Sequence, residues 1–191
     1  MGIADSPAVL QRHRLTVDEY HRMGQAGVFP PDARVELIDG EVIDMAPIGT
    51  RHASAVKKLN ALLSAAAGGS AIVAVQDPLR LSDASEPEPD LMLLRPRADF
   101  YAHAHPGPAD VLLLIEVSDS TAAYDRGIKL DLYARHGVAE VWIVDLDNDV
   151  VRVFRHGDGT AYTDITASET PRATPVAALP GVTIDLSSLL A

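Results

Sequence analysis

Two carboxylates stand at the ends of short aliphatic segments, where an isolated negative charge is expensive to bury. Asp90 follows Pro89 and begins the apolar run 91–94, and Glu116 interrupts the apolar run 111–117 near its end. Proline marks a strand entrance because it lacks an amide donor, and a buried carboxylate needs a cation, a hydrogen-bond network or solvent. Taken alone, each acid is also explained by a strand end that meets water. If the two strands adjoin, the acids can share a hard divalent cation, which prefers oxygen ligands and keeps several waters.

A scarce lysine follows the second acid. Asp125, Lys129 and Tyr133 are spaced i, i+4 and i+8, so a helix would place them on one face. The chain has 3 lysines against 13 arginines, so a lysine at this position indicates a need for a compact ammonium charge. The alternative is a surface pair between Asp125 and Lys129, which would stabilise the helix by only ~0.3–0.5 kcal/mol.

Together the two acids and the lysine predict a metal-assisted phosphodiesterase. Mg²⁺ is the natural ion and Mn²⁺ can substitute for it. The ion polarises a phosphoryl oxygen and lowers the pKa of a bound water. The Lys129 ammonium can orient the attacking water or stabilise charge that develops on the phosphate. The main-chain carbonyl of Val117 is a further candidate ligand, and Glu36 is a candidate third acid that holds a second metal or a metal-bound water.

Composition and charge exclude several other classes of site. The 191 residues include no cysteine, which excludes a disulfide framework, a zinc–thiolate site, an iron–sulfur cluster and a cysteine nucleophile. With 16 basic and 27 acidic residues the net charge is −11, so DNA would have to meet a local basic patch or bound metal ions. The longest aliphatic run, 111–115, is far shorter than the ~20 residues of a membrane-spanning helix. We therefore expect a cytoplasmic protein without membrane contact.

The residues that carry this chemistry fall on predicted elements of one domain, 15–191, behind a flexible N-terminal arm, 1–14. Thr16 and Glu19 form a capping box before a short helix. The remaining elements are a type I′ hairpin within 34–45 around Asp39-Gly40, a helix over 50–67 that Gly68 ends, strands at 71–75, 79–81, 91–94 and 111–117, a helix from Ser120 or Thr121 to His136, a hairpin at 141–144 and 150–154, an irregular tail at 166–180 and a last strand at 182–186.

This order predicts an α+β or mixed α/β fold in which helices flank a mixed, mainly antiparallel sheet with extra hairpins. The run 111–117 is almost continuously apolar, which is typical of a strand covered on both faces. The helix between this strand and the strand at 141–144 allows a parallel crossover. Such a crossover would place the helix face that carries Lys129 next to the end of the strand that carries Glu116.

Several motifs, in their order along the chain, resemble a known nuclease family. They are Arg34-Val35-Glu36-Leu37-Ile38-Asp39-Gly40-Glu41, His52, Pro89-Asp90, Glu116-Val117-Ser118-Asp119-Ser120-Thr121, Tyr124-Asp125-Arg126-Gly127 with Lys129 and Tyr133, Gly137-Val138, and Glu140-Val141-Trp142-Ile143-Val144-Asp145. From about residue 15 to residue 164 the sequence resembles the PD-(D/E)XK nuclease superfamily and, within it, the Uma-two family of restriction-endonuclease-like proteins. The resemblance implies a restriction-endonuclease-like core, a divalent metal and an acid set at Glu36, Asp90 and Glu116. Ser118 replaces the strand lysine of the superfamily, so the resemblance implies that Lys129 supplies the ammonium from the following helix.

We therefore expect a Mg²⁺-dependent endonuclease that acts on DNA, with His52 and Tyr133 as substrate-contacting residues. By analogy with two-ended cutting of duplex DNA, we expect a homodimer. A satisfied histidine at the edge of the core is an equal alternative for His52. The main alternative function is a nuclease-like fold that no longer cuts and acts as a binding or assembly module. A transition-metal site at His103 and His105, with Asp99 nearby, is a further alternative. Candidate contacts to the DNA backbone are Arg12, Arg14, Arg51, Lys57, Lys58, Arg126 and Arg135.

Overall fold

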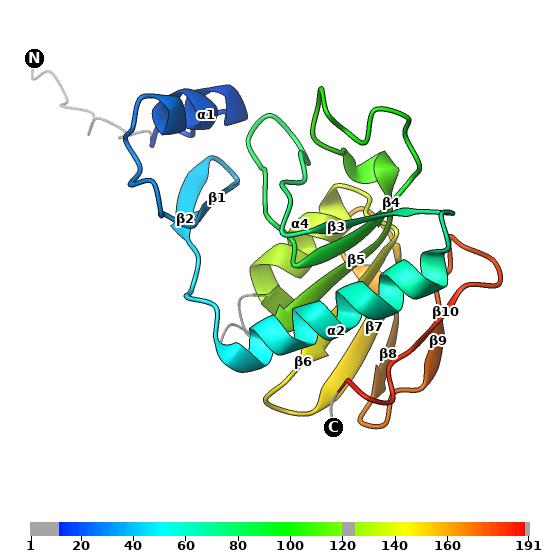
Figure 1. Cartoon of the computed structure of the whole chain (residues 1–191). Coiled ribbons are helices and arrows are strands. Elements are labelled where there is room, and N and C mark those ends of the chain that lie inside the picture. The colour runs from blue at the N-terminus through cyan, green and yellow to red at the C-terminus, as the bar shows by residue number, and fades with distance from the viewer. Residues whose placement is uncertain (1–11, 120–124, 190–191) are drawn as a thin grey trace, which may run out of the picture.

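The computed structural model describes residues 12–119 and 125–189. Its centre is a six-stranded mixed sheet with the strand order β3-β4-β5-β6-β7-β8 (Figure 1). β5 and β6 run parallel, and the other neighbouring pairs run antiparallel, as the predicted mixed, mainly antiparallel sheet requires. The strands are β3 (Ile72–Val75), β4 (Leu91–Leu94), β5 (Val111–Ser118), β6 (Glu140–Asp145), β7 (Val150–Gly157) and β8 (Tyr162–Ser168).

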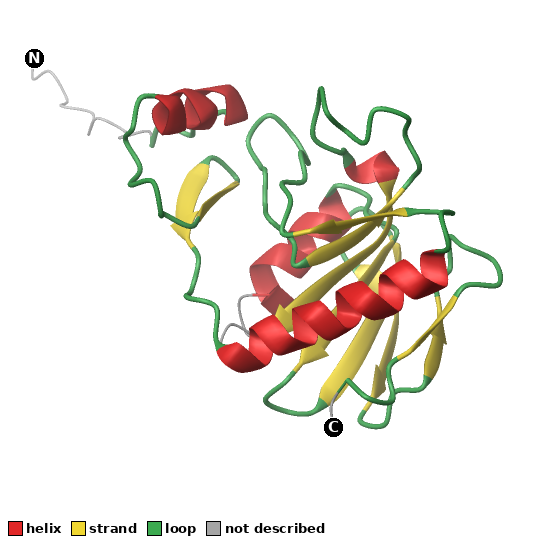
Figure 2. Cartoon of the chain, viewed as in Figure 1, coloured by secondary structure: helices red, strands yellow, loops and turns green. Residues whose placement is uncertain are grey.

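Helices cover both faces of the sheet (Figure 2). Among the helices of the described residues, none is both long and apolar enough to cross a membrane. The helical elements are α1 (Val17–Gln25), α2 (Thr50–Ala67), the 3₁₀ turn η1 (Pro108–Asp110), the π-helical turn η2 (Asp125–Lys129) and α4 (Leu130–Arg135).

Side chains that alternate along β4 divide the interior into two cores. Leu91 and Leu93 pack with α2 on one face of the sheet, and Met92 and Leu94 pack with α4 on the other. Figure 1 shows α2 and α4 on opposite faces of the sheet. Because both faces are covered, every residue of β4 and β5 is buried. This confirms the prediction that β5 is a fully covered strand, and it makes the carboxylate of Glu116 an internal group.

A small hairpin of β1 (Val35–Ile38) and β2 (Glu41–Asp44) lies beside the main sheet together with α1 (Figure 1). The predicted capping box of α1 is present. Asp39 and Gly40 have φ angles of 47° and 76°, as the predicted type I′ turn requires. The hairpin continues through the segment 45–49 into α2, which begins and ends at the predicted residues.

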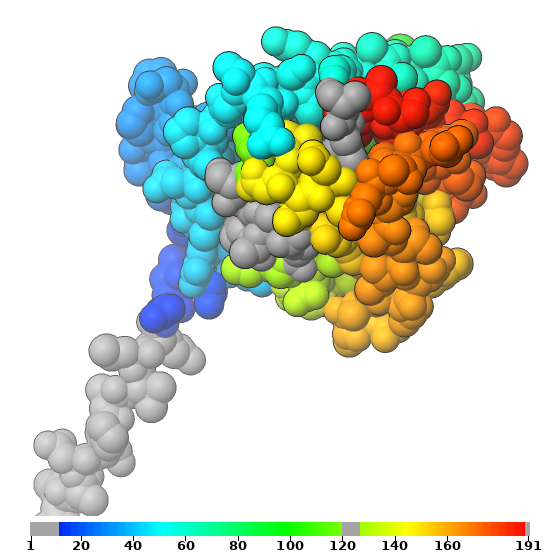
Figure 3. Space-filling model, turned by 90° about the horizontal axis from the view of Figure 1, so that it is seen from below, coloured from blue at the N-terminus to red at the C-terminus, as the bar shows by residue number. Residues whose placement is uncertain are grey.

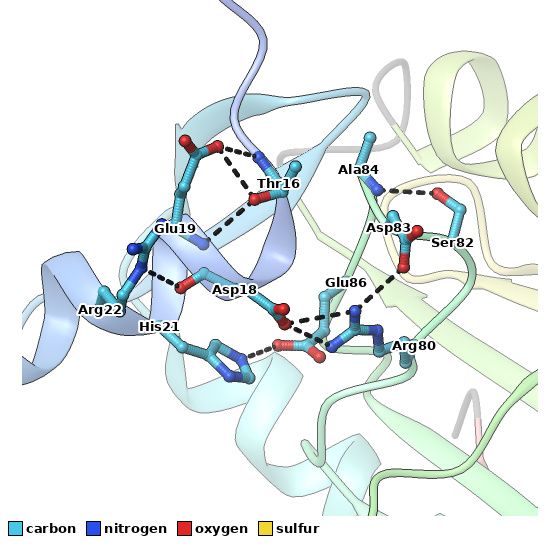
Figure 4. Close-up of polar contacts among 10 residues, drawn as sticks. All are labelled: Thr16, Asp18, Glu19, His21, Arg22, Arg80, Ser82, Asp83, Ala84 and Glu86. Carbon is cyan, nitrogen blue, oxygen red and sulfur yellow. Dashed lines mark hydrogen bonds and ion pairs between the residues drawn. The ribbon is translucent and has the colours of Figure 1, made fainter.

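The loop that leads into β4 is attached to α1 by side-chain contacts (Figure 4) and to β1 through its main chain. Arg80 of this loop lies 3.4 Å from Asp18 of α1, and the ring of His21 contacts the buried carboxylate of Glu86 at 2.5 Å. The main chain of Glu86 also exchanges hydrogen bonds of 2.8 and 3.4 Å with Leu37 of β1. One loop therefore ties the hairpin to the strand that begins after Asp90.

Two predicted segments differ in the structure. Residues 79–81 form no strand, and Leu79 and Leu81 are buried by a compact loop in which their amides bond to main-chain carbonyls of the same loop. The tail predicted to be irregular contains the end of β8 and the strand β9 (Ala173–Pro175). β8 exposes most of its side chains at the edge of the sheet, so apolar alternation could not reveal it.

The last predicted strand is confirmed as β10 (Thr183–Asp185), which pairs with β9. The segment after it lies against α2 on the surface (Figure 3). Leu186 and Leu189 join the core of α2, and Lys58 Nζ donates to the Ser188 carbonyl at 3.2 Å. Residues 1–11 of the predicted N-terminal arm lie outside the described residues. So do Ser120 and Thr121, the two candidate N-caps of the helix predicted to end at His136.

Candidate active site

A cavity of about 300 Å³ lies where β1, the start of β4, the end of β5 and the start of α2 meet. The four residues predicted to be catalytic, Glu36, Asp90, Glu116 and Lys129, all line it. Residues 43–49, which run from the end of β2 to the start of α2, form one wall. Residues from distant parts of the chain therefore converge on one space.

Asp90 lies at the junction of β4 and β5. Its Oδ2 accepts a hydrogen bond of 2.8 Å from the Val117 amide and lies 3.0 Å from His52 Nε2. The amide of Asp90 donates to Glu116 Oε2 at 3.3 Å. These contacts arise because β4 begins one residue after Asp90 and pairs with β5. Strand pairing thus brings the two acids to adjoining strand ends.

The main chain of Val117 faces the same side as Asp90. In an extended strand the N–H and C=O of one residue point to the same edge, and the Val117 amide donates to Asp90. The carbonyl of Ser118 points to the opposite edge, where it accepts from the Leu146 amide at 2.8 Å. The carbonyl of Val117 is therefore directed toward the edge that carries the acids.

Lys129 lies between two carboxylates. Its Nζ is 3.0 Å from Glu36 Oε2 and 3.3 Å from Glu116 Oε1. The side chains of Lys129, Glu36 and Glu116 are 5%, 2% and 4% exposed, so this is a buried ion cluster. Lys129 therefore points toward the acids, as predicted, although it lies in a π-helical turn rather than in a regular α-helix.

Tyr133 reaches the site through Glu116 and is not among the residues that line the cavity. It is fully buried, and its hydroxyl donates to Glu116 Oε1 at 2.6 Å. Lys129 and Tyr133 both reach Glu116, as the i, i+4 spacing predicts, while the side chain of Asp125 lies outside the described part of the chain. Tyr133 is thus placed to hold Glu116, and its role as a substrate contact stays a prediction.

Glu36 is separated from Glu116 by the ammonium of Lys129. Its Oε2 also accepts from the Glu88 amide at 3.2 Å. Across residues 12–119 and 125–189, no group of three or more His, Asp or Glu side chains is arranged to hold a metal ion. Glu36 is therefore placed as a partner of Lys129, and its role as a metal ligand stays a prediction.

His52, in the first turn of α2, is tied to Asp90. The hydrogen bond with Asp90 raises the pKa of His52 above its ordinary value of 6.5, against the opposing effect of burial. Its other ring nitrogen, Nδ1, is buried and has no hydrogen-bond partner among the described residues. The imidazole is therefore placed to support the Asp90 carboxylate, and its role as a substrate contact stays a prediction.

We expect the contact between His52 and Asp90 to stabilise the metal-free protein in a pH-dependent way. A folded-state pKa above the unfolded value means that the stabilisation is complete below about pH 6.5 and is lost as the pH rises through the folded pKa. The free energy of unfolding of wild type minus that of His52→Gln should fall as the pH rises. Urea titrations in EDTA at several pH values measure this difference, and a constant difference would contradict the predicted linkage.

Sequence reasoning missed several polar residues at the site, among them Glu88 and Gln76. Glu88 lines the cavity, where burial raises its pKa and the nearby charge of Glu36 raises it further. Glu88 stands two residues before Asp90 in a proline-rich stretch. In an extended chain alternate side chains point to the same side, so this spacing could have indicated that Glu88 faces the site. Gln76 Nε2 donates to Asp90 Oδ1 at 3.4 Å. No sequence pattern marks Gln76, because its contact depends on the pairing of β3 with β4.

Several of the cations predicted to contact DNA are paired with acids of the chain itself. The side chain of Arg126 lies outside the described part of the chain. The pairs are Arg14–Glu41, Arg51–Asp119, Arg51–Asp147 and Arg135–Asp39, with N···O distances of 2.6, 3.4, 3.4 and 3.0 Å. These arginines are largely exposed, so each pair is worth little and can exchange for a phosphate.

The alternative metal site in the loop 95–109 has a different set of contacts. Asp99 pairs with Arg97 at 2.5 Å, and the ring of His105 lies 6.3 Å from that of His21. Asp99 is therefore engaged with Arg97 rather than with a histidine of this loop, and a metal site here stays an alternative prediction.

The fold and the sequence both have known counterparts. A crystal structure of "a putative nuclease belonging to DUF820 from Anabaena variabilis ATCC 29413" superposes with a TM-score of 0.67 at 15% sequence identity, covering 92% of this chain and 97% of that chain. At this identity the likeness shows the fold, a mixed sheet flanked by helices. No curated protein is significantly similar to the chain. The model of the Uma2 family, described as "Putative restriction endonuclease", matches residues 17–187. Because this match spans most of its length, the chain belongs to the Uma2 family.

Proposed function

We propose that this protein is a Mg²⁺-dependent endonuclease that hydrolyses phosphodiester bonds of DNA. The observation that carries the proposal is the convergence of Asp90, Glu116 and Lys129, with the carbonyl edge of Val117, at one cavity. Membership of a family described as restriction endonucleases supports DNA as the substrate. Two-copy assembly and a cytoplasmic location stay predictions.

The donors at the strand ends fit Mg²⁺. Asp90 and Glu116 offer carboxylate oxygens and Val117 offers a carbonyl oxygen, and all of these are hard ligands. Mg²⁺ usually binds through one or two carboxylates and keeps several waters, so a third clustered acid is not required. When bound here, the ion would supply Lewis-acid polarisation of a phosphoryl oxygen. Mn²⁺ accepts the same class of ligands.

Other residues at the site position the Lys129 ammonium and hold the two acids in place. Glu36 and Glu116 hold the Lys129 ammonium on two sides, so it needs no reorientation to donate a hydrogen bond to the attacking water or to a phosphoryl oxygen. The hydroxyl of Tyr133 fixes Glu116, and the imidazole of His52 fixes Asp90. Supports of this kind typically change metal affinity or activity by about 10–100-fold when removed.

We expect divalent ions to stabilise the folded protein through this site. Binding to the folded state alone stabilises by about 2.7 kcal/mol at 100 times the dissociation constant. Mg²⁺, Mn²⁺ or Ca²⁺ should therefore raise the midpoint of thermal unfolding of wild type. The variant Asp90→Asn should lose this shift, and Asp131→Asn, at an exposed position of α4, should keep it.

The outcome also separates the two hypotheses for function. An equal shift in wild type and in the double variant Asp90→Asn, Glu116→Gln would place ion binding elsewhere. If wild type neither cuts plasmid DNA nor gains stability from divalent ions, the chain is better described as a nuclease-like binding or assembly module.

A further inference from the structure

Arg34 brings a guanidinium into the cavity. It stands two residues before Glu36, so strand alternation directs both side chains to the same face, and both line the cavity. Its Nη1 donates to the Ala46 carbonyl at 3.0 Å, which fixes the side chain against the wall formed by residues 43–49. Among residues 12–119 and 125–189, this carbonyl is the only hydrogen-bond or ion-pair partner of the Arg34 side chain.

The other cations of the cavity are engaged with acids. Lys129 is held between two carboxylates, and His52 faces Asp90. Arg34 lines the same space, and its side chain forms no ion pair with the described residues. Its guanidinium therefore offers a positive charge that a phosphate entering the cavity can meet.

The lining of the cavity makes this cation important for a polyanionic substrate. Six carboxylates face the cations Arg34 and Lys129 and the imidazole of His52 there, so a phosphate would be repelled unless positive charge remains available. An arginine offers five N–H donors in a planar fork that matches a phosphate, and the contact with Ala46 uses one of them. The six acids are Glu36, Asp44, Glu88, Asp90, Glu116 and Asp119.

We propose that Arg34 binds the DNA phosphate that enters the cavity, through paired N–H···O hydrogen bonds, and so positions the phosphodiester beside Asp90 and Glu116. The inference rests on the proposed nuclease function and adds a substrate-positioning residue to it. A purely structural role at the end of the hairpin would make no difference to DNA affinity or to its dependence on salt.

The test compares two arginines with similar contacts. Arg95 is exposed and lies outside the cavity, and it too bonds a main-chain carbonyl, that of Ala109 at 2.9 Å. Arg34→Met and Arg95→Met therefore change the net charge equally. Binding of a short labelled DNA duplex is followed by fluorescence anisotropy in Ca²⁺ over a range of salt, and KM and kcat are measured in Mg²⁺.

Arg34→Met should weaken DNA binding and raise KM roughly 10- to 100-fold, as expected for a lost hydrogen bond to a charged group. It should also reduce the salt slope of binding by about one. Arg34→Lys keeps the charge and a donor for Ala46 but loses the fork, and it should bind with intermediate affinity. Arg95→Met should match wild type.

Failure of this inference differs from failure of the proposed function. Wild-type affinity and salt slope in Arg34→Met, or equal losses in the two methionine variants, would overturn the role of Arg34 even if the protein cuts DNA. If wild type binds DNA without cutting it, the nuclease proposal fails and the anisotropy comparison still decides on Arg34. No DNA binding by wild type would overturn both. Should Arg34→Met fail to fold, wild-type binding by a folded Arg34→Lys would overturn the inference.

Discussion

Replacing Asp90 by asparagine is expected to slow Mg²⁺-dependent cleavage of DNA at least about 100-fold, or roughly 2.7 kcal/mol of transition-state stabilisation. The change keeps the size of the side chain and an oxygen that can accept from the Val117 amide. It removes the negative charge, and a neutral amide oxygen is a weaker ligand than a carboxylate for a hard divalent ion. We expect Glu116→Gln to have an effect of the same order, because the two acids adjoin.

The rate of plasmid nicking measures this loss, with circular dichroism as a check on folding. Asp131→Asn and Glu169→Gln are matched controls, since they make the same chemical changes at exposed positions. Both controls should cut at the wild-type rate. If Asp90→Asn and Glu116→Gln both retained full cutting, the cleavage would have to come from another site or from a contaminant.

Removing the Lys129 ammonium is expected to give the largest loss of stability. In Lys129→Met the carboxylates of Glu36 and Glu116 stay buried without the cation that lies between them. Removing one partner of a buried ion pair typically destabilises by ~3–5 kcal/mol. For a chain of this length, that lowers the midpoint of thermal unfolding by roughly 6–20 °C.

Two further variants show whether the loss comes from the ion cluster. Arg135→Met breaks the exposed pair with Asp39 and should change the free energy of unfolding by only ~0–1 kcal/mol. The double variant Glu36→Gln, Lys129→Met should recover much of the loss, because the remaining Glu116 still accepts from the Tyr133 hydroxyl. Urea titrations measure all of these values. Additive effects in the double variant would mean that Glu36 and Lys129 do not interact.

The local elements of this protein were accessible from its sequence. The Asp39-Gly40 turn, the capping box at Thr16 and the helix α2 each depend on residues within a few positions of one another. The buried character of β5 followed from its apolar run, and the spacing of Lys129 and Tyr133 correctly placed both toward one partner. The elements whose patterns are weak, such as the exposed edge strand β8, were missed for the same reason.

Sequence alone also selected the two strand acids and the lysine, since charges within or beside buried segments are costly and few. Only the tertiary structure decided which groups meet. The contact of Glu36 with Lys129, the burial of Tyr133 and the entry of Arg34 into the cavity depend on how the hairpin docks against the core. Such contacts join residues far apart in the chain, and they are fixed by strand register and packing, to which every element contributes. A local pattern therefore determines which side of its own element a residue occupies, but it does not determine what that side will face.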